Sequence, residues 1–423
     1  MNPALLIVVF LTLTAIGLPI AFVLLGTGVA VTMADPDILE VAYVQNLIVG
    51  TQSFPLIAIP LFVLAGELMN ISGITKRLMH FASALTAHMI GGLAQVNIVL
   101  STLKAGMMGS ANADAAMDAK TLVPEMVKRG YSPAYASVVT AASGLIAPMI
   151  PPGIGLILYG FVTDTSIGRL FMAGIIPGLL MTAAMMMLAH LIAKRRGYGR
   201  DSEPVGRAEL WRSFLSSVPA LLMPVIIVVG IRFGVFTASE AGAVAVLYAA
   251  AFCLIYREAN WREFMTSLSS TAVTTSVIMI ILAASAALSW TLSFEQIPQK
   301  VAAGLVGLAS EPPVLFLVVG CLLLIAGMFV EGTALILILA PMFAPAAVKL
   351  GIDPVHFGIF FVYMIHLGGI TPPVGTIMFT TCAITKVPLP AFIAESWPWL
   401  VMLLIIAAVL AAVPGLSTWL GYL

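Results

Sequence analysis

PEMVKRGYSP at residues 124–133 and PAAVKLGIDP at residues 345–354 are two copies of one pattern, and they decide the fold. The two segments agree at five of ten positions, and the offset between them is 345 − 124 = 221 residues. The same offset places Pro372-Pro373 on Pro151-Pro152. Because self-similarity at a fixed offset indicates a repeated architecture, the sequence predicts two halves built on one plan.

The composition is typical of a membrane protein. Of the 423 residues, 61% are hydrophobic and 9% are charged, and the mean hydropathy is +1.10. An average soluble protein is about 25% charged, and a membrane-spanning helix needs about 20 apolar residues. Six runs approach or exceed that length: 4–31, 50–70, 215–231, 264–293, 313–330 and 397–422. The sequence therefore predicts an all-α polytopic membrane protein.

Charge and cysteine content exclude several classes of function. Lys plus Arg and Asp plus Glu each number 19, so the net charge is zero and nothing favours nucleic-acid binding. The three cysteines lie far apart in apolar runs, which predicts buried free thiols rather than a metal site or a disulfide. The first apolar run has no basic leader and no small-residue cleavage site, so we expect a retained first helix.

The basic residues predict the orientation of the chain in the membrane. Residues 194–212 contain six of them and should form a cytoplasmic loop. Following the chain outward from this loop leaves 13 basic residues inside and four outside, with Lys104 and Lys120 set aside. The two halves then enter the membrane from opposite sides. Inverted repeats of this kind are typical of secondary transporters.

Each half should contain a re-entrant helical hairpin followed by an interrupted helix. In the first half, the hairpin is 86–128 with its tip at 106–112, and the interrupted helix is 133–166 with its break at 148–155. In the second half, the hairpin is 313–349 with its tip at 327–333, and the interrupted helix is 354–386 with its break at 368–375. Non-helical backbone is tolerated in a membrane only where it is buried in protein or lines a watery cavity, so we expect the four breaks to meet at one site.

This plan divides the chain into five segments. They are scaffold helices at 1–85, half of a transport domain at 86–193, a cytoplasmic loop at 194–212, further scaffold helices at 213–311, and the other half of the transport domain at 312–423.

The breaks offer two kinds of binding group. Free carbonyls with Ser and Thr hydroxyls suit Na⁺, whereas the free amides that begin the next helix attract a carboxylate. The candidates for contacting an anionic substrate are Ser110, Asn112, Gly153, Thr333 and Thr376.

Ionisable residues inside the membrane are usually functional, because charge there costs several kcal/mol. We rank Glu331 and Asp114 highest, although each could instead accept hydrogen bonds from its own hairpin tip. Lys104 should pair with Asp114 or Asp118, or contact an anionic substrate. We expect Glu67 and Glu240 each to lie at the end of a helix. The five histidines form no spaced cluster that would indicate a metal site or proton relay.

Six motifs in order carry a resemblance that covers nearly the whole chain. They are IPLFVLAGELM at 59–69, GSANAD at 109–114, APMIPP at 147–152, LFMAGIIPG at 170–178, TASEAGA at 237–243 and ITPPVG at 370–375. With these motifs the chain resembles the large membrane subunit of tripartite ATP-independent periplasmic (TRAP) transporters.

The resemblance implies a multi-pass protein of the bacterial inner membrane that imports a small organic anion with Na⁺ by an elevator mechanism. It implies two partners, a small membrane subunit and a periplasmic substrate-binding protein, and no catalytic activity or organic cofactor. By position, the Na⁺ ligands would be Ser110, Gly144, Ile150, Gly327, Glu331, Gly369 and Thr371. Relatives often have Asp where this chain has Glu331, and a second Ser near Asn112, so the shape of the cation cage is open.

Two alternatives stay open at this point. A stand-alone Na⁺/divalent-anion symporter of related architecture would need no binding protein. An intramembrane hydrolase would use Ser110 as nucleophile and would need a base such as His190 or His366 within reach. The substrate is also open among C4-dicarboxylates, sialic acid, sugar acids and keto acids, because no intramembrane Arg is placed to bind a carboxylate in a bidentate manner.

Overall fold

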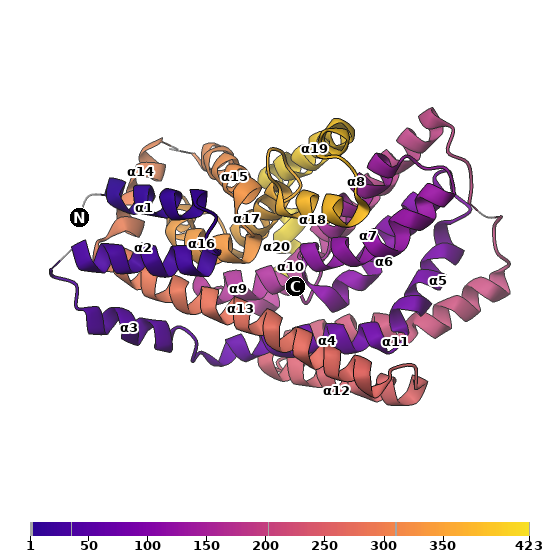
Figure 1. Ribbon diagram of the computed structural model, residues 1–423, viewed down its shortest axis with the longest axis horizontal. Helices are drawn as coiled ribbons and strands as arrows, with labels where there is room; N and C mark the ends of the chain where they lie inside the picture. The colour runs from indigo at the N-terminus through magenta and orange to yellow at the C-terminus, as the bar shows by residue number, and fades with distance from the viewer. Residues whose placement is uncertain (1–2, 35, 202, 309–310, 423) are drawn as a thin grey trace.

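The computed structural model describes residues 3–34, 36–201, 203–308 and 311–422, and every regular element in these ranges is a helix (Figure 1). The first repeat contains α1 (Pro3–Ala15), α2 (Ile20–Ala34), α3 (Glu40–Val49), the 3-10 helix η1 (Phe54–Ile57), α4 (Ala58–Ile71), α5 (Ile74–Thr86), α6 (Gly92–Met108), α7 (Ala111–Lys128), α8 (Pro133–Gly144), α9 (Ile154–Val162) and α10 (Ile167–Arg196). The second contains α11 (Arg207–Arg232), α12 (Ala238–Tyr256), α13 (Trp261–Phe294), α14 (Ile297–Leu308), α15 (Pro312–Phe329), α16 (Gly332–Lys349), α17 (Pro354–Gly368), α18 (Thr376–Thr385), α19 (Leu389–Ala412) and α20 (Gly415–Tyr422).

The described helices confirm a multi-pass membrane protein. Eight of them are long and apolar enough to cross a bilayer, the longest being α13 with 34 residues. A bilayer core of about 30 Å needs about 20 helical residues at 1.5 Å per residue.

The 221-residue offset holds in three dimensions. α7 and α16 begin at residues 111 and 332, and α8 and α17 begin at residues 133 and 354, each pair differing by 221. Packing between the halves is reciprocal, because α12 packs on α4 as α2 packs on α13, and α18 packs on α7 as α16 packs on α9. Such exchanged contacts are what a two-fold relation produces.

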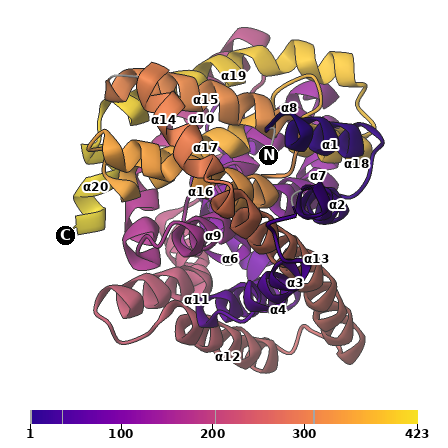
Figure 2. The ribbon, with the colours of Figure 1, turned by 90° about the vertical axis from the view of Figure 1, so that its left-hand side faces the viewer.

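The repeats are inverted along the long axis of the molecule. In Figure 1 the α1–α2 pair lies at one end and its counterpart, α11–α12, at the other. The α6–α7 and α15–α16 hairpins likewise approach the middle from opposite ends. Figure 2, viewed along this axis, places α4, α11 and α12 on one side and α15, α17 and α19 on the other, with α9 and α16 between them.

Two apolar runs that we expected to form single helices are each divided into two. Residues 4–31 form α1 and α2, which pack side by side, because Gly17 adopts φ +83° and Pro19 precedes the second helix. With 13 and 15 residues, each is too short to span a bilayer alone. Residues 397–422 divide in the same way, since α19 ends before Pro414 and α20 follows it. Hydropathy alone does not register such turns.

The halves differ in one scaffold segment. The second half has the continuous helix α13, whereas the equivalent first-half residues form α3, η1 and α4. Gly50 ends α3, and Pro55 lies in the first turn of η1, where it cannot donate the hydrogen bond that a continuous helix requires. The equivalent stretch 271–278 of α13 contains neither Gly nor Pro.

The expected loop and hairpin bounds need correction. The loop expected at 194–212 is shorter, because α10 continues to Arg196 and α11 begins at Arg207. The first hairpin begins at Gly92, not at residue 86, because Gly91 turns the chain at φ +73°. Both tips are tighter than predicted, because only Gly109-Ser110 and Val330-Glu331 leave the helical state.

Candidate functional site

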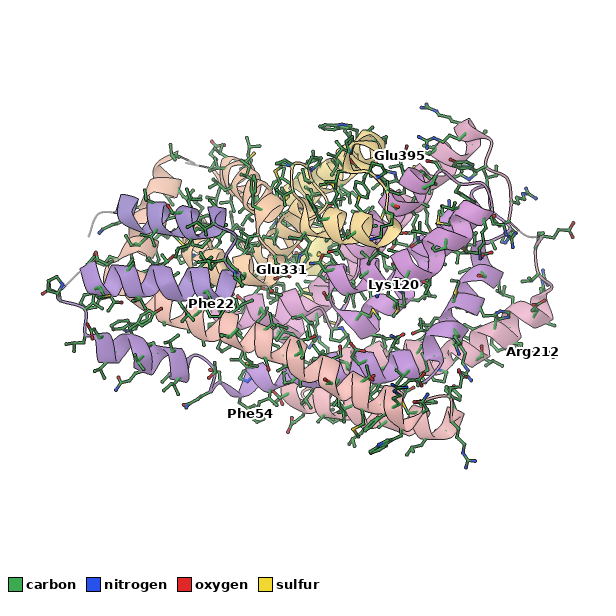
Figure 3. All side chains as sticks on the ribbon, viewed as in Figure 1. Phe22, Phe54, Lys120, Arg212, Glu331 and Glu395 are labelled. Carbon is green, nitrogen blue, oxygen red and sulfur yellow. The ribbon has the colours of Figure 1, made fainter. Side chains whose placement is uncertain are left out.

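The two hairpin tips meet at a cavity of about 800 Å³. Its walls come from the tips, from α4 and α13, and from residues next to both helix breaks. Figure 3 labels Glu331 of the second tip and Lys120 of α7, both of which line the cavity.

The first tip is a Gly-Ser turn that begins α7. Gly109 has φ +59°, and a Cβ added there would lie 2.5 Å from the Pro152 carbonyl oxygen, so only glycine fits. The backbone N–H of Ile154 donates to the Gly109 carbonyl at 3.2 Å, which ties the tip to the helix break of its own half. Ser110 is the N-cap of α7 and accepts a hydrogen bond from the Ala113 N–H at 3.5 Å.

The second tip repeats this arrangement with a carboxylate. Glu331 is the N-cap of α16 and accepts from the backbone N–H of Thr333 at 2.9 Å and from the Thr333 hydroxyl. The Gly375 N–H donates to the Met328 carbonyl at 2.7 Å and again joins tip to break. Because 331 − 110 = 221, Glu331 and Ser110 occupy one repeat position.

The helix breaks are alike in both halves. The expected break at 148–155 comprises residues 145–153, and the one at 368–375 comprises residues 369–375. Each contains a cis peptide bond between two prolines, Pro151-Pro152 and Pro372-Pro373. Gly153 and Gly375 are the last residues of the breaks, so α9 and α18 begin next to the tips. Some of their first amides are already paired, because the Ile154 N–H donates to Gly109 and the Ile377 N–H donates to Gly369.

The structure brings most of the expected site residues to the cavity. Those that line it are Ser110, Asn112, Gly327, Glu331, Thr333, Gly369 and Thr376. The Asn112 Oδ1 atom is buried and has no hydrogen-bond partner among the described residues. An unsatisfied buried acceptor is uncommon in native proteins, so this oxygen is available to a ligand.

The other expected ligands lie behind the tips and do not line the cavity. Gly153 packs on the Pro148 carbonyl, Gly144 on Ala111 and Ala115 of α7, and Ile150 on Gly178 of α10. The Thr371 hydroxyl donates to the Leu367 carbonyl at 2.7 Å.

Two of the four expected backbone ligands, Gly144 and Gly369, already accept hydrogen bonds through their carbonyls. The Gly369 carbonyl accepts the N–H groups of Ile377 and Met378 at 2.8 and 3.2 Å, and the Gly144 carbonyl accepts that of Ala147 at 3.2 Å. A cation at Gly369 would therefore compete with two amides.

A buried polar network fills the first hairpin. The Lys104 ammonium lies 2.9 Å from Asp114 Oδ1 and 2.5 Å from Asp118 Oδ1, and all three side chains are almost completely buried. Ser101 joins the network through Asp118 at 3.2 Å. Lys104 thus pairs with both candidate acids. Asp114 faces this lysine inside the hairpin and does not line the cavity.

Three ionisable residues of the cavity were missed or misplaced by sequence reasoning. Glu67 lies within α4, not at its end, and accepts from the Ser270 hydroxyl of α13 at 3.0 Å. His366 lines the cavity with its Nδ1 2.7 Å from the Val362 carbonyl. Lys120 follows Ala113 and Ala116 at helical spacing, and that spacing on α7 is the signal that would have found it.

Glu240 is at a helix end as expected. It forms a capping box with Thr237 at the start of α12, where the Thr237 N–H donates to its carboxylate at 2.8 Å.

Among the described residues, no group of three or more His, Cys, Asp or Glu side chains could hold a metal ion. Ser110 has no His, Asp or Glu hydrogen-bond partner in that part of the chain. The site therefore lacks the nucleophile–base pair that a hydrolase needs.

Inverted repeats, paired re-entrant hairpins and a cavity at the repeat interface define a secondary membrane transporter. The chain belongs to the family of the DctM component of tripartite ATP-independent periplasmic transporters, whose sequence profile matches residues 7–416. Members of this family are permease subunits and not enzymes.

Characterised relatives are similar over nearly their whole length. The sialic acid TRAP transporter large permease protein SiaM of Vibrio cholerae is 37% identical over 412 residues, which cover 96% of each chain. The 2,3-diketo-L-gulonate TRAP transporter large permease protein YiaN of Escherichia coli is 38% identical over 404 residues, or 95% of each chain. The C4-dicarboxylate TRAP transporter large permease protein DctM of Pseudomonas aeruginosa is 37% identical over 402 residues, or 94% of each chain.

Two solved structures share the fold at low sequence identity. The crystal structure of the YdaH transporter of Alcanivorax borkumensis, described as having an unusual topology, matches with a TM-score of 0.63 and 14% identity, covering 95% of this chain and 97% of that one. The structure of MtrF of Neisseria gonorrhoeae matches with a TM-score of 0.54 and 14% identity, covering 87% and 82%.

Proposed function

We propose that this large TRAP permease imports a small organic anion together with Na⁺ across the inner membrane of a bacterium. The observation that carries the proposal is the meeting of four helix N-termini at one cavity. α7, α9, α16 and α18 begin at Ala111, Ile154, Gly332 and Thr376, and all four residues line it. Because a helix N-terminus carries roughly +0.5 elementary charge and unpaired amides, the four together favour a carboxylate.

The substrates named for the relatives agree with this chemistry. Sialic acid, 2,3-diketo-L-gulonate and C4-dicarboxylates are all organic acids. Candidates for this chain are therefore C4-dicarboxylates, sialic acid, sugar acids and keto acids. We assign contacts with the acid to Ser110, Asn112, Thr333 and Thr376, and to the α9 amides that follow Gly153.

Na⁺ would bind at the tips, next to the anion. Ser110 and Glu331 offer side-chain oxygens at equivalent positions of the two repeats. Behind them, the backbone at Gly144, Ile150, Gly327 and Gly369 and the hydroxyl of Thr371 would complete the cages. Broken helices that present carbonyls to a cation and amides to an anion suit coupled transport.

The proposed movement is an elevator. Segments 86–193 and 312–423, which contain both hairpins and both broken helices, would slide as one body past the helices of 1–85 and 213–311. The cavity supports this division, because the tips form one wall and α4 with α13 form the facing wall.

Two partners complete the proposed transporter. A small membrane subunit would cover lipid-facing surfaces of α1, α2, α11 and α12, which expose large apolar side chains such as Leu11, Phe22, Val225 and Leu247. A periplasmic binding protein would deliver the substrate near Arg169, Arg232 and residues 295–300.

The orientation has its own test. The turns α4–α5, α7–α8 and α12–α13 and the loop α10–α11 lie at one end of the molecule, which we assign to the cytoplasm (Figure 1). A membrane-impermeant thiol reagent applied to intact cells should label a single cysteine at Gly351 and spare one at Gly199. The reverse pattern would contradict the assigned direction of transport.

Uptake into proteoliposomes tests the function. The chain, its small subunit and its binding protein are reconstituted, and labelled anions of the four candidate classes are supplied with a Na⁺ or a K⁺ gradient. We expect uptake of at least one anion that requires both Na⁺ and the binding protein. Equal uptake in K⁺ would refute the coupling, and robust uptake without the binding protein would favour the stand-alone symporter.

A further inference from the structure

Lys120 is the one Lys or Arg among the described residues that line the cavity between the tips. It projects from α7, the helix that begins at the first tip, and the same wall contains Ser110, Asn112 and Met117. The equivalent residue of the second half is Pro341, because 341 − 120 = 221. The cavity therefore has one full positive charge, and it is on one side only.

The Lys120 ammonium has no hydrogen-bond or ion-pair partner among the described residues. The two acids of the cavity are engaged elsewhere. Glu331 accepts hydrogen bonds from Thr333, and Glu67 accepts one from Ser270 at 3.0 Å. Of the two other lysines of the α6–α7 hairpin, Lys104 is completely buried against its two aspartates, and Lys128 lies 3.7 Å from Glu125. Lys120 is thus a free cation facing a cavity whose acids have other partners.

The direction of the side chain favours a ligand at the tips. Lys120 follows Ala111 by nine residues, which is about 14 Å along a helix axis. Helical side chains lean toward the N-terminus of their helix, so the ammonium leans back toward the tip and shortens this distance. An anion in the cavity would lie between this ammonium and the amides of the four converging helices.

Lys120 is exposed. Beyond it, a groove on α13 shares Val273 and Thr274 with the cavity and continues past Ser269 to Arg262. The hydroxyls of this groove offer a polar route between the cavity and the end of the molecule that carries the α12–α13 turn.

We propose that Lys120 supplies the counter-charge that binds the carboxylate of the transported anion, and so selects anionic over neutral substrates. This inference rests on the proposed function, because it assigns a binding partner to the same substrate. Lysine binds a carboxylate as a point charge, which suits a site that must also release it.

The test compares four versions of the reconstituted transporter: wild type, Lys120→Gln, Lys120→Arg and Lys128→Gln. The last is the matched control, because Lys128 is on the same helix, lies outside the cavity and pairs only loosely with Glu125 at 3.7 Å. The probes are a C4-dicarboxylate, N-acetylneuraminate, a sugar acid and a keto acid, each radiolabelled. Thermal stabilisation of the purified chain by each unlabelled anion is measured in parallel.

For the transported anion, Lys120→Gln should raise the KM about 10-fold to 100-fold, because a hydrogen bond to a charged group is lost. Its melting temperature without anion and its half-maximal Na⁺ concentration should stay at the wild-type values. Lys120→Arg should stay within about threefold of wild type, and Lys128→Gln should match it. Modification of Lys120→Cys with the positively charged 2-aminoethyl methanethiosulfonate, in a chain whose native cysteines are serine, should restore uptake, whereas methyl methanethiosulfonate should not.

A wild-type KM in Lys120→Gln, with uptake by the wild type intact, would overturn this inference and leave the proposed function standing. If the wild type takes up none of the four anions and none of them stabilises it, this inference and the proposed function are both overturned.

Discussion

Removing the positive charge of the buried Lys104 triad should be the most damaging single change in the first hairpin. Lys104→Met leaves Asp114 and Asp118 in the interior without the ammonium that now lies 2.9 and 2.5 Å from them. Breaking a buried ion pair from one side costs about 3–5 kcal/mol, because an uncompensated charge remains. With the unfolding entropy per residue of globular proteins, this is a drop of roughly 3–6 °C in melting temperature for 423 residues.

The second repeat indicates which substitutions should restore the lost stability. At the positions equivalent to Lys104, Asp114 and Asp118 it has Ile325, Leu335 and Leu339, each 221 residues later. The triple variant Lys104→Ile/Asp114→Leu/Asp118→Leu should therefore regain most of the lost stability, since replacing a whole buried ion network with apolar side chains is often neutral or stabilising.

The assay is thermal unfolding of the purified chain in detergent, followed by intrinsic fluorescence. Lys76→Met is the matched control, because this lysine is 84% exposed, and its 3.4 Å pair with Glu258 should contribute no more than about 1 kcal/mol. If Lys104→Met melts like wild type, or if the triple variant melts as low as the single one, the network does not stabilise the hairpin as argued.

Two further predictions concern the tips. Ser110→Ala and Glu331→Gln should each raise the Na⁺ concentration that gives half-maximal uptake in proteoliposomes, because each removes or weakens a candidate oxygen ligand; unaltered Na⁺ dependence in both would place the cages elsewhere. Gly109→Ala should abolish uptake and should lower the melting temperature more than Gly130→Ala does. Both glycines have positive φ, but only Gly109 has a backbone oxygen 2.5 Å from the added carbon. Equal effects of the two substitutions would show that the close approach at the tip is unimportant.

The repeat explains why so much of the fold could be predicted. The offset found in 124–133 and 345–354 holds for the starts of α7 and α16 and for those of α8 and α17. A hairpin in the membrane needs non-helical backbone that is itself visible as Gly, Pro and hydroxyl residues. The predicted helix bounds were less accurate where a turn depends on a single glycine. Gly327 was expected in a tip but stays helical, and its lack of a side chain instead lets α15 approach Gly368.

The site was less predictable, because sequence spacing says which residues share an element but not which elements face each other. Asp114 lies four residues after Ser110, yet it turns away from the cavity toward Lys104. Glu67 was expected at a helix end, but it lies within α4, lines the cavity and accepts a hydrogen bond from Ser270 of α13. Both outcomes depend on the packing of α6 and α13 against their neighbours.

Positions at which the two repeats have the same residue determine the shared backbone fold, and positions at which they differ place the charged groups of the cavity. Where the two halves agree, as at the proline pairs Pro151-Pro152 and Pro372-Pro373, they produce two similar breaks at one cavity. Where they differ, charge is present on one side only: Ser110 against Glu331, and Lys120 against Pro341. Since a symmetric cavity would treat both ends of a substrate alike, positions that break the 221-residue correspondence are the ones through which this chain would fix the orientation of an anion.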